Sequence, residues 1–232
     1  MAQGSSTTPS AVTRVRSSLT RRDVLVGGWM GLTVLAYYHN FLFVQSTALS
    51  YAYAISSYGV GVLFARYDAT VKHLLVIGTI GGVLELLADY FLVEIAGTLA
   101  YPSGYPFVLR SPAYMPFAWA ILIAFMGYVG LRLADEVGRT AAYLGPAVFA
   151  FVAESGYESL ASRGGGWTYT DAPLGWVGHA PLFVLVAEAA MFASVYYWVR
   201  RDSVTGGIGI GMTVIASYAG VYYLFTLLAV IT

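Results

Sequence analysis

The chain has 232 residues, of which 58% are hydrophobic and 10% are charged, and its formal net charge is zero. Soluble domains carry about 25% charged residues, so this composition predicts an all-α protein that crosses a membrane several times. The sequence contains no cysteine and no basic stripe with interleaved aromatic residues, which excludes disulfides and thiolate catalysis and argues against binding of nucleic acid.

The N-terminal segment, residues 1–20, is rich in serine and threonine, and we expect it to form a disordered cytoplasmic tail. The motif TRRDVLVGG at 20–28 resembles a twin-arginine export signal. No persuasive cleavage site follows it, so we interpret the motif as the positively flanked start of the first helix. Residues 21–232 are expected to form a single transmembrane domain.

Seven apolar runs of about 20 residues, the length that a bilayer core requires, follow along the chain. They cover 24–44, 46–64, 72–95, 114–133, 140–161, 180–199 and 207–230. With the N-terminus inside, only Arg110 and Arg163 of the twelve Lys and Arg residues fall outside. Positive residues in short loops stay cytoplasmic, so the sequence predicts seven transmembrane helices, N-in and C-out. We expect them to lie in the cell membrane of a prokaryote.

The last predicted helix has no lysine. The single lysine of the chain, Lys72, lies at the inner end of the third helix. A retinal Schiff base on the last helix is therefore excluded, and the protein is not a functional opsin.

The third and fifth helices each carry two carboxylates four residues apart, a spacing that places both on one helical face. The pairs are Glu85 with Asp89 and Glu154 with Glu158. Each helix is followed by an outer loop and then by another apolar helix. We therefore expect helices three and four, and helices five and six, to form parallel repeat hairpins. Glu188, in the sixth helix, is expected at nearly the same depth.

Five carboxylates are thus the candidate catalytic residues: Glu85, Asp89, Glu154, Glu158 and Glu188. A charge at the bilayer centre costs about 3 kcal/mol, so these side chains must face the bundle interior or a wet cavity. Gly78 and Gly82 share the helical stripe of the first pair, which fits close packing on that face. Either several of the five are protonated at neutral pH, because burial and mutual repulsion disfavour charge, or a cation lies among them.

The chain offers few ligands other than these acids. Only three histidines are present, so the histidine clusters of membrane desaturases and hydroxylases are missing. We expect no metal ion and no cofactor, although carboxylates alone can hold a hard cation. Glu94, the third acid of its helix, lies nearer the interface and is the last of the acids that we expect to take part.

Aromatic and histidine side chains in and beside the outer loops are candidates for binding the substrate. They are Tyr101, Trp119, Trp167, Tyr169, His179, His39 and Tyr222. Such residues are also typical of the interfacial aromatic belt of membrane proteins, and this alternative stays open for each. In the functional interpretation, these side chains surround the five carboxylates, and the faces of their aromatic rings stabilise a cation.

An apolar site with several carboxyls and no visible redox centre suits acid–base chemistry on an alkene. A carboxyl protonates the alkene, and the carbocation is captured by a second alkene or by water, or loses a proton. The sequence predicts an integral membrane cyclase, hydratase or isomerase whose partner is a lipophilic isoprenoid dissolved in membrane lipid. Two alternatives stay open, namely a proton- or cation-coupled transporter and a non-catalytic lipid- or pigment-binding protein.

Two stretches of the chain carry a family resemblance. They are EIAGTLAY at 94–101 with SPAYMPFAW at 111–119, and GGWTY at 165–169 with GHAPLF at 178–183. Their layout resembles that of the bisanhydrobacterioruberin hydratases and membrane lycopene cyclases. The chain is also similar to the small seven-helix meroterpenoid cyclases, which depend on intramembrane carboxylates.

The resemblance covers roughly residues 80–190 and implies a carotenoid or terpenoid substrate. The residues that match are Glu94, Tyr101, Pro116, Trp119, Trp167 and Tyr169. The P-x-E-[ED] motif of the lycopene cyclases is absent, because Phe117 and Ala118 follow Pro116, and Leu182 and Phe183 follow Pro181. The resemblance therefore does not extend to lycopene as the substrate.

Overall fold

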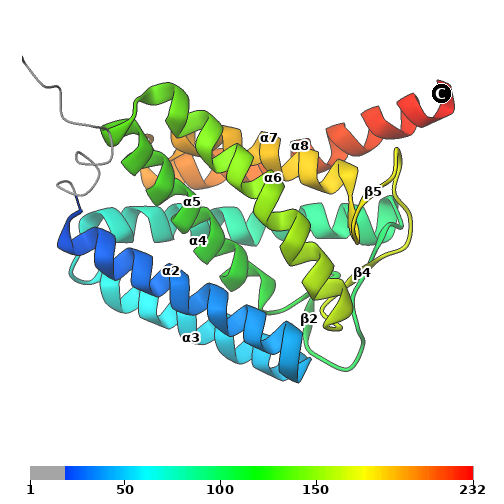
Figure 1. The fold of residues 1–232 in the computed structure, drawn as a ribbon, viewed down its shortest axis with the longest axis horizontal. Coiled ribbons are helices and arrows are strands. Elements are labelled where there is room, and N and C mark those ends of the chain that lie inside the picture. Colours follow the sequence, from blue (N-terminus) through cyan, green and yellow to red (C-terminus); the bar gives the residue numbers. More distant parts are fainter. Residues whose placement is uncertain (1–18, 232) are drawn as a thin grey trace, which may run out of the picture.

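The structure is a computed structural model that describes residues 19–231, so most of the expected tail, residues 1–18, lies outside the described residues. The described part contains seven α-helices (Figure 1). They are α2 (Arg21–His39), α3 (Thr47–Ala65), α4 (Ala69–Tyr90), α5 (Met115–Glu136), α6 (Arg139–Arg163), α7 (Leu182–Trp198) and α8 (Ser203–Ile231). The all-α fold class and the seven helical segments predicted from the sequence are confirmed.

Two of the helices end in a π-helical turn. These turns are η1 (Asn40–Val44) after α2 and η2 (Phe91–Ile95) after α4. In the first, the buried Asn40 amide donates to the Ser46 carbonyl oxygen and to Ser50 Oγ, at 2.9 Å each. A buried polar side chain is thereby satisfied at the turn between α2 and α3.

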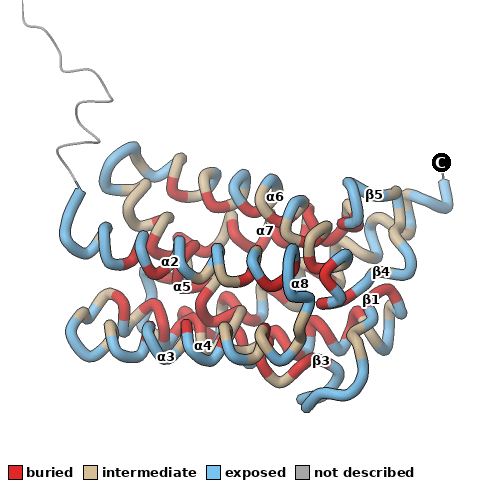
Figure 2. Tube along the Cα trace, turned by 60° about the horizontal axis from the view of Figure 1, so that its bottom comes forward, coloured by how far each residue is buried: buried red, intermediate tan, exposed pale blue. Residues whose placement is uncertain are grey.

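Four helical segments are long and apolar enough to cross a membrane. They are Thr47–Ala65, Ala69–Ile95, Met115–Glu136 and Ser203–Ile231. A fifth apolar helix, α7, has 17 residues. The outer faces of the bundle are strongly apolar; Leu32, Phe43 and Val152 are 71%, 77% and 66% exposed. Figure 2 shows the buried residues gathered in the interior of the bundle, with exposed segments along its surface.

An ion pair joins α2 to the start of α4 at the end of the bundle where α2 begins. Asp68 caps α4 by accepting from the backbone N–H groups of Thr70 and Val71, and it pairs with Arg22 at 2.6 Å. Partial burial acts to raise the pKa of Asp68, but these hydrogen bonds and the guanidinium outweigh it and hold the pKa below its usual value.

The small residues of α4 let α5 approach closely. A Cβ atom added at Gly82 would lie 2.5 Å from the carbonyl oxygen of Pro116 and 2.9 Å from the backbone nitrogen of Ala120. Gly78 likewise faces the backbone of Ala120. The glycine stripe that carries the first acid pair is therefore an interior face, as the sequence predicted.

The two loops that join α4 to α5 and α6 to α7 fold alike. The first contains β1 (Leu99–Ala100), β2 (Phe107–Val108) and β3 (Ser111–Pro112), and the second contains β4 (Thr168–Tyr169), β5 (Trp176–Val177) and β6 (Ala180–Pro181). In each loop the second and third strands form an antiparallel hairpin. β1 pairs with β4 antiparallel, and this pairing joins the two loops.

The correspondence between the two halves holds residue by residue. Each strand of the second loop begins 69 positions after its counterpart, as Leu99 and Thr168 illustrate. The acid pairs have the same offset, because Glu154 follows Glu85 and Glu158 follows Asp89 by 69 positions. Helices α4 and α5 with their loop therefore form one half of a structural repeat, and α6 and α7 with theirs form the other.

Candidate functional site: a cavity lined by carboxylates

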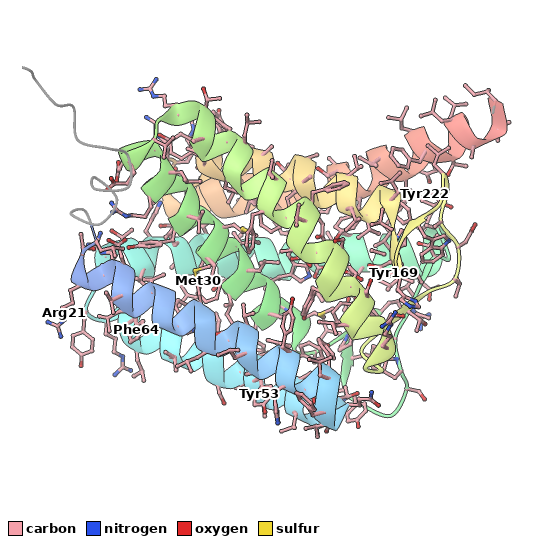
Figure 3. The ribbon with its side chains drawn as sticks, viewed as in Figure 1. Arg21, Met30, Tyr53, Phe64, Tyr169 and Tyr222 are labelled. Carbon is pink, nitrogen blue, oxygen red and sulfur yellow. The ribbon has the colours of Figure 1, made fainter. Side chains whose placement is uncertain are left out.

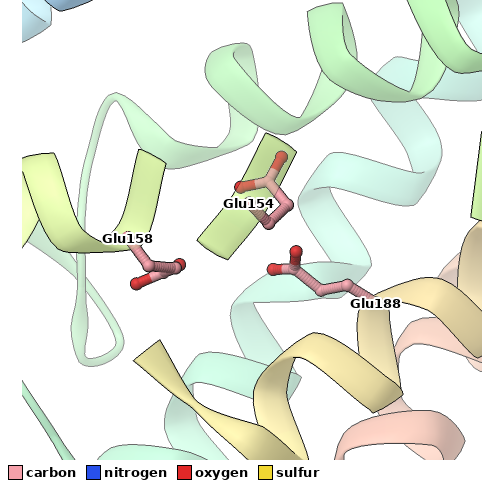
Figure 4. A group of neighbouring side chains, drawn as sticks. All are labelled: Glu154, Glu158 and Glu188. Atoms are coloured by element: carbon pink, nitrogen blue, oxygen red, sulfur yellow. The ribbon is translucent and has the colours of Figure 1, made fainter. Parts of the chain in front are cut away.

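Three glutamates meet inside the second half of the repeat. Glu154 and Glu158 lie one turn apart on α6, and Glu188 faces them from α7 (Figure 4). Each offers a carboxylate oxygen, and these oxygens lie within 4.8 Å of one another. All three side chains are buried. We call Glu154, Glu158 and Glu188 the glutamate cluster.

The members of the cluster differ in their hydrogen bonds. Glu158 Oε2 accepts from Trp167 Nε1 at 2.7 Å, and Glu188 Oε1 accepts from Tyr218 Oη at 2.7 Å. Within residues 19–231, the second oxygen of Glu188 has no hydrogen-bond partner. The same part of the chain provides no side-chain hydrogen bond to Glu154, whose carboxyl faces the cavity. Glu154 is therefore the cluster member most free to exchange a proton with a ligand.

The first acid pair is arranged differently. Asp89 Oδ2 accepts from Tyr101 Oη at 2.6 Å and from Ser111 Oγ, so the first loop holds this carboxylate from two sides. Glu85 lies one turn before Asp89 on α4, and its Oε2 has no partner among the described residues. Asp89 lines the cavity, whereas Glu85 does not and is 1% exposed. Asp89 is therefore the member of this pair that reaches the cavity.

A cavity of about 370 Å³ contains four of the five predicted acids: Asp89, Glu154, Glu158 and Glu188. The rest of its wall is almost entirely apolar or aromatic. Trp119, Ile121 and Phe125 contribute from α5, and Tyr37 contributes from α2. A volume of this size, with a few convergent polar groups in an apolar wall, is typical of a small-molecule site.

Aromatic rings surround the acids. The ring of Trp167 lies 5.7 Å from that of Tyr157 and 6.3 Å from that of Tyr101, measured between centroids. Tyr169 also lines the cavity; Figure 3 labels it at the end of the bundle opposite Arg21. Of the seven predicted binding residues, the structure brings four to the cavity: Tyr101, Trp119, Trp167 and Tyr169.

The remaining predicted residues lie outside the cavity wall. The His39 ring is 3.4 Å from Tyr53 Oη, and the backbone N–H of His179 donates to Ser159 Oγ at 3.1 Å. Tyr222 stacks edge-on against Phe183 at 5.4 Å. These three positions stabilise the loop end of the bundle without reaching the acids.

Glu94 is also separate from the acids of the cavity. It forms an ion pair with Arg110 at 2.6 Å, and the two side chains are 35% and 56% exposed. An exposed pair of this kind contributes little to stability and cannot exchange protons with the buried cluster directly. The expectation that Glu94 would be the least involved acid agrees with this position.

Several lining residues were not predicted from the sequence. Tyr157 and Tyr37 reach the cavity from α6 and α2, and Ser111 holds Asp89 from β3. A usable signal existed for Tyr157, because it lies one residue before Glu158 within the AESGYES segment. Tyr37 lies on α2, whose acid Asp23 is at the other end of the helix, so no local pattern distinguishes this tyrosine from the others.

The cluster also has the donor set of a hard cation. Three carboxylates are ligands that Ca²⁺, Mg²⁺ or Mn²⁺ accept, and the mutual approach of their oxygens is compatible with a shared ion. An ion bound there would occupy the oxygens that otherwise carry protons. Cation binding and acid catalysis are therefore competing uses of the same three side chains.

The domain of unknown function DUF6989 matches residues 86–229. The matched region begins one residue after Glu85, and it includes both outer loops and the glutamate cluster. No curated protein and no solved structure matches the chain. Since the match covers more than half of the sequence, the chain belongs to the DUF6989 family.

Proposed function

We propose that the protein is an integral membrane enzyme that performs acid–base chemistry on an isoprenoid. In this proposal all seven helices cross the membrane, with the N-terminus in the cytoplasm and the C-terminus outside. The four long apolar helices and the apolar outer surface support the location. The observation that carries the activity is a largely apolar cavity in which several buried carboxyls converge.

In the proposed reaction Glu154 is the acid. Its carboxyl faces the cavity, and no side-chain hydrogen bond from residues 19–231 restrains it. The protonated carboxyl transfers its proton to one carbon of an alkene, which leaves a carbocation on the other carbon. A second alkene of the same molecule then forms a carbon–carbon bond to that centre, or water adds to it.

A carboxylate ends the reaction by removing a proton from the product cation. Asp89 is suited to this role because Tyr101 and Ser111 hold its oxygen in place at the cavity wall. Glu158 is the alternative base, oriented by Trp167. When Glu158 is the base, the carboxylate oxygens of the glutamate cluster lie within 4.8 Å of one another, so the proton can pass back to Glu154 and restore the starting state.

The aromatic wall supplies the remaining stabilisation. The faces of aromatic rings attract cations, by about 2 kcal/mol or more when water is absent. Trp119 and Trp167 line the cavity that contains the acids. They would stabilise the carbocation between its formation and its capture, without competing for the proton.

The test compares lipid extracts from the source organism with the gene deleted and complemented. Complementation uses the wild-type chain, Glu154→Gln, or the matched control Glu94→Gln, whose side chain is ion-paired outside the cavity. We expect one isoprenoid product to be lost in the deletion strain, restored by wild type and by Glu94→Gln, and absent with Glu154→Gln. Identical isoprenoid profiles in the deletion and wild-type strains would refute the proposal.

The glutamate cluster favours one other candidate, a proton- or cation-coupled transporter, because buried carboxylates in repeats also mark ion pathways. Ion flux into proteoliposomes distinguishes the two. Flux that requires Glu154 and occurs without any change in isoprenoid lipids would favour transport.

A further inference from the structure

The cavity opens to the side of the bundle. Among the lining residues that the structure describes, only Val34 on α2 and Phe149 on α6 are exposed, at 49% and 53%. Ala153 lies one turn from Phe149 on α6 and also lines the cavity. The two exposed side chains mark a mouth between α2 and α6, which we call the lateral mouth.

The lateral mouth lies deeper in the bundle than the acids. Phe149 precedes Glu154 by five residues on α6, which corresponds to roughly 8 Å along the helix, away from the outer loops. Neighbouring side chains on the same helix, such as Val148 and Val152, are 62% and 66% exposed. In the proposed orientation the mouth therefore faces the hydrocarbon of the bilayer and not its head groups.

The polarity along the cavity sets the direction of binding. Val34 and Phe149 at the mouth are apolar, and the neighbouring Thr33 hydroxyl already donates to the Trp29 carbonyl oxygen. The carboxyls of Glu154 and Asp89 lie further in. A ligand end with a polar or charged head group would have to leave water and cross this apolar stretch, at a cost of several kcal/mol. The end that enters is therefore apolar.

The size of the cavity limits how much of a chain it takes. A cavity of about 150 Å³ holds one benzene molecule, so a volume of about 370 Å³ holds roughly fifteen carbon atoms, or three isoprene units. A longer chain is not excluded, because the mouth leaves the remainder in the bilayer.

We infer that the site takes in the apolar end of a long isoprenoid lipid sideways from the bilayer, through the mouth between Val34 and Phe149. About fifteen carbon atoms enter, and the rest of the chain stays in the membrane. The isoprenoid nature of this ligand rests on the proposed function. The route and the length limit rest on the cavity alone.

Binding of tritiated squalene to the protein in nanodiscs tests the route, with empty nanodiscs as background. Ala153→Phe narrows the mouth, and overpacking of this kind lowers affinity by about tenfold or more. The matched control is Val152→Phe, the same substitution at a neighbouring position on the exposed face of α6, and we expect it to leave binding unchanged. Equal loss in both variants, or no binding to the wild-type chain, would overturn the inference.

The second part of the experiment compares hydrocarbons of different chain length. Farnesene fits within the cavity, whereas squalene is twice as long. With concentrations expressed per lipid, we expect the two hydrocarbons to bind with affinities within about threefold, because the added units stay in lipid. Binding of farnesene with exclusion of squalene would show a closed cavity and overturn the inference. Neither arm involves product formation, so squalene binding without any reaction would count against the proposed function only.

Discussion

In the first half of the repeat, Glu85 is 1% exposed and does not line the cavity, whereas in the second half its counterpart Glu154 does. The backbone does not explain this difference, because the strands and acid pairs of the two halves share one offset. The side chains at equivalent positions of the facing helices differ. Position 119 on α5 holds a tryptophan, and the equivalent position 188 on α7 holds a glutamate.

The comparison shows how a duplicated scaffold becomes an asymmetric site. The second half gathers three carboxyls, and the first half provides one cavity-lining carboxylate, Asp89, and a large ring, Trp119. A site that must both donate a proton and stabilise a cation needs unlike groups on opposite walls. Divergence at equivalent positions of the repeat supplies them.

The difference between the two halves is tested most strongly by replacing the first acid of each pair. Glu154→Gln removes the proposed proton donor, and since general acids contribute about 10²- to 10⁴-fold, we expect product formation to fall by at least about 100-fold. Glu85→Gln keeps the cavity acids in place, and we expect a fall of less than about tenfold. The measurement is the initial rate of product formation in membranes with equal amounts of each variant.

Glu94→Gln is the control for these rates, since it removes a carboxylate outside the cavity. Equal losses in Glu85→Gln and Glu154→Gln would mean that both halves supply protons alike. That result would contradict the division of roles between them.

Trp119 gives the next largest expected effect. Trp119→Leu keeps the wall apolar and removes the π face, so we expect the rate to fall by about 30-fold, the equivalent of about 2 kcal/mol. Trp119→Phe retains a ring and should recover most of the rate. Trp176→Leu changes an exposed loop tryptophan outside the cavity, and we expect it to leave the rate of product formation unchanged. If Trp119→Leu reacts as fast as the wild type, the Trp119 ring contributes only to packing and does not stabilise the carbocation.

The sequence predicted the convergence of acids because the i, i+4 spacing and the repeat act through the helix itself. It did not predict that Glu85 lies outside the cavity wall or that Tyr101 and Ser111 hold Asp89, because both depend on how distant segments pack together. The two-residue strands also escaped prediction, since so short a segment has no periodic pattern.

The lateral mouth could not be predicted for a related reason. Val34 and Phe149 are ordinary apolar residues on exposed helix faces, and only the relative placement of α2 and α6 distinguishes them. The predicted residues His39, His179 and Tyr222 lie by the loops, as their positions in the chain imply. The sequence could not show that the cavity opens on the other side of the acids, away from the loops.

A smaller effect concerns how tightly each half is packed. Gly82 faces the backbone of α5, and its counterpart is the larger Phe151. We expect Gly82→Ala to lower the free energy of unfolding by about 1–3 kcal/mol, because the backbone cannot yield to the added methyl group. Gly156→Ala on α6 meets no atom within 4 Å and should be neutral or stabilising. Denaturation in mixed micelles measures both, and equal stabilities would refute the close α4–α5 contact.

The smallest expected effect comes from Thr98, whose counterpart in the second half is Trp167. The Trp167 ring nitrogen donates to Glu158, but the Thr98 hydroxyl is fully buried and has no partner among the described residues. In the first half, Tyr101 and Ser111 donate the hydrogen bonds to Asp89 instead.

An unpaired buried hydroxyl costs about 1–3 kcal/mol. Thr98→Val is nearly isosteric, so it should raise the free energy of unfolding by about 1 kcal/mol without changing product formation. Thr170→Val provides the contrast, because that hydroxyl donates to the Gly97 carbonyl oxygen and its loss should be slightly destabilising. If Thr98→Val is less stable than wild type, the Thr98 hydroxyl has a partner, such as a buried water. The first half would then keep a polar contact at this position, as the second half does at Trp167.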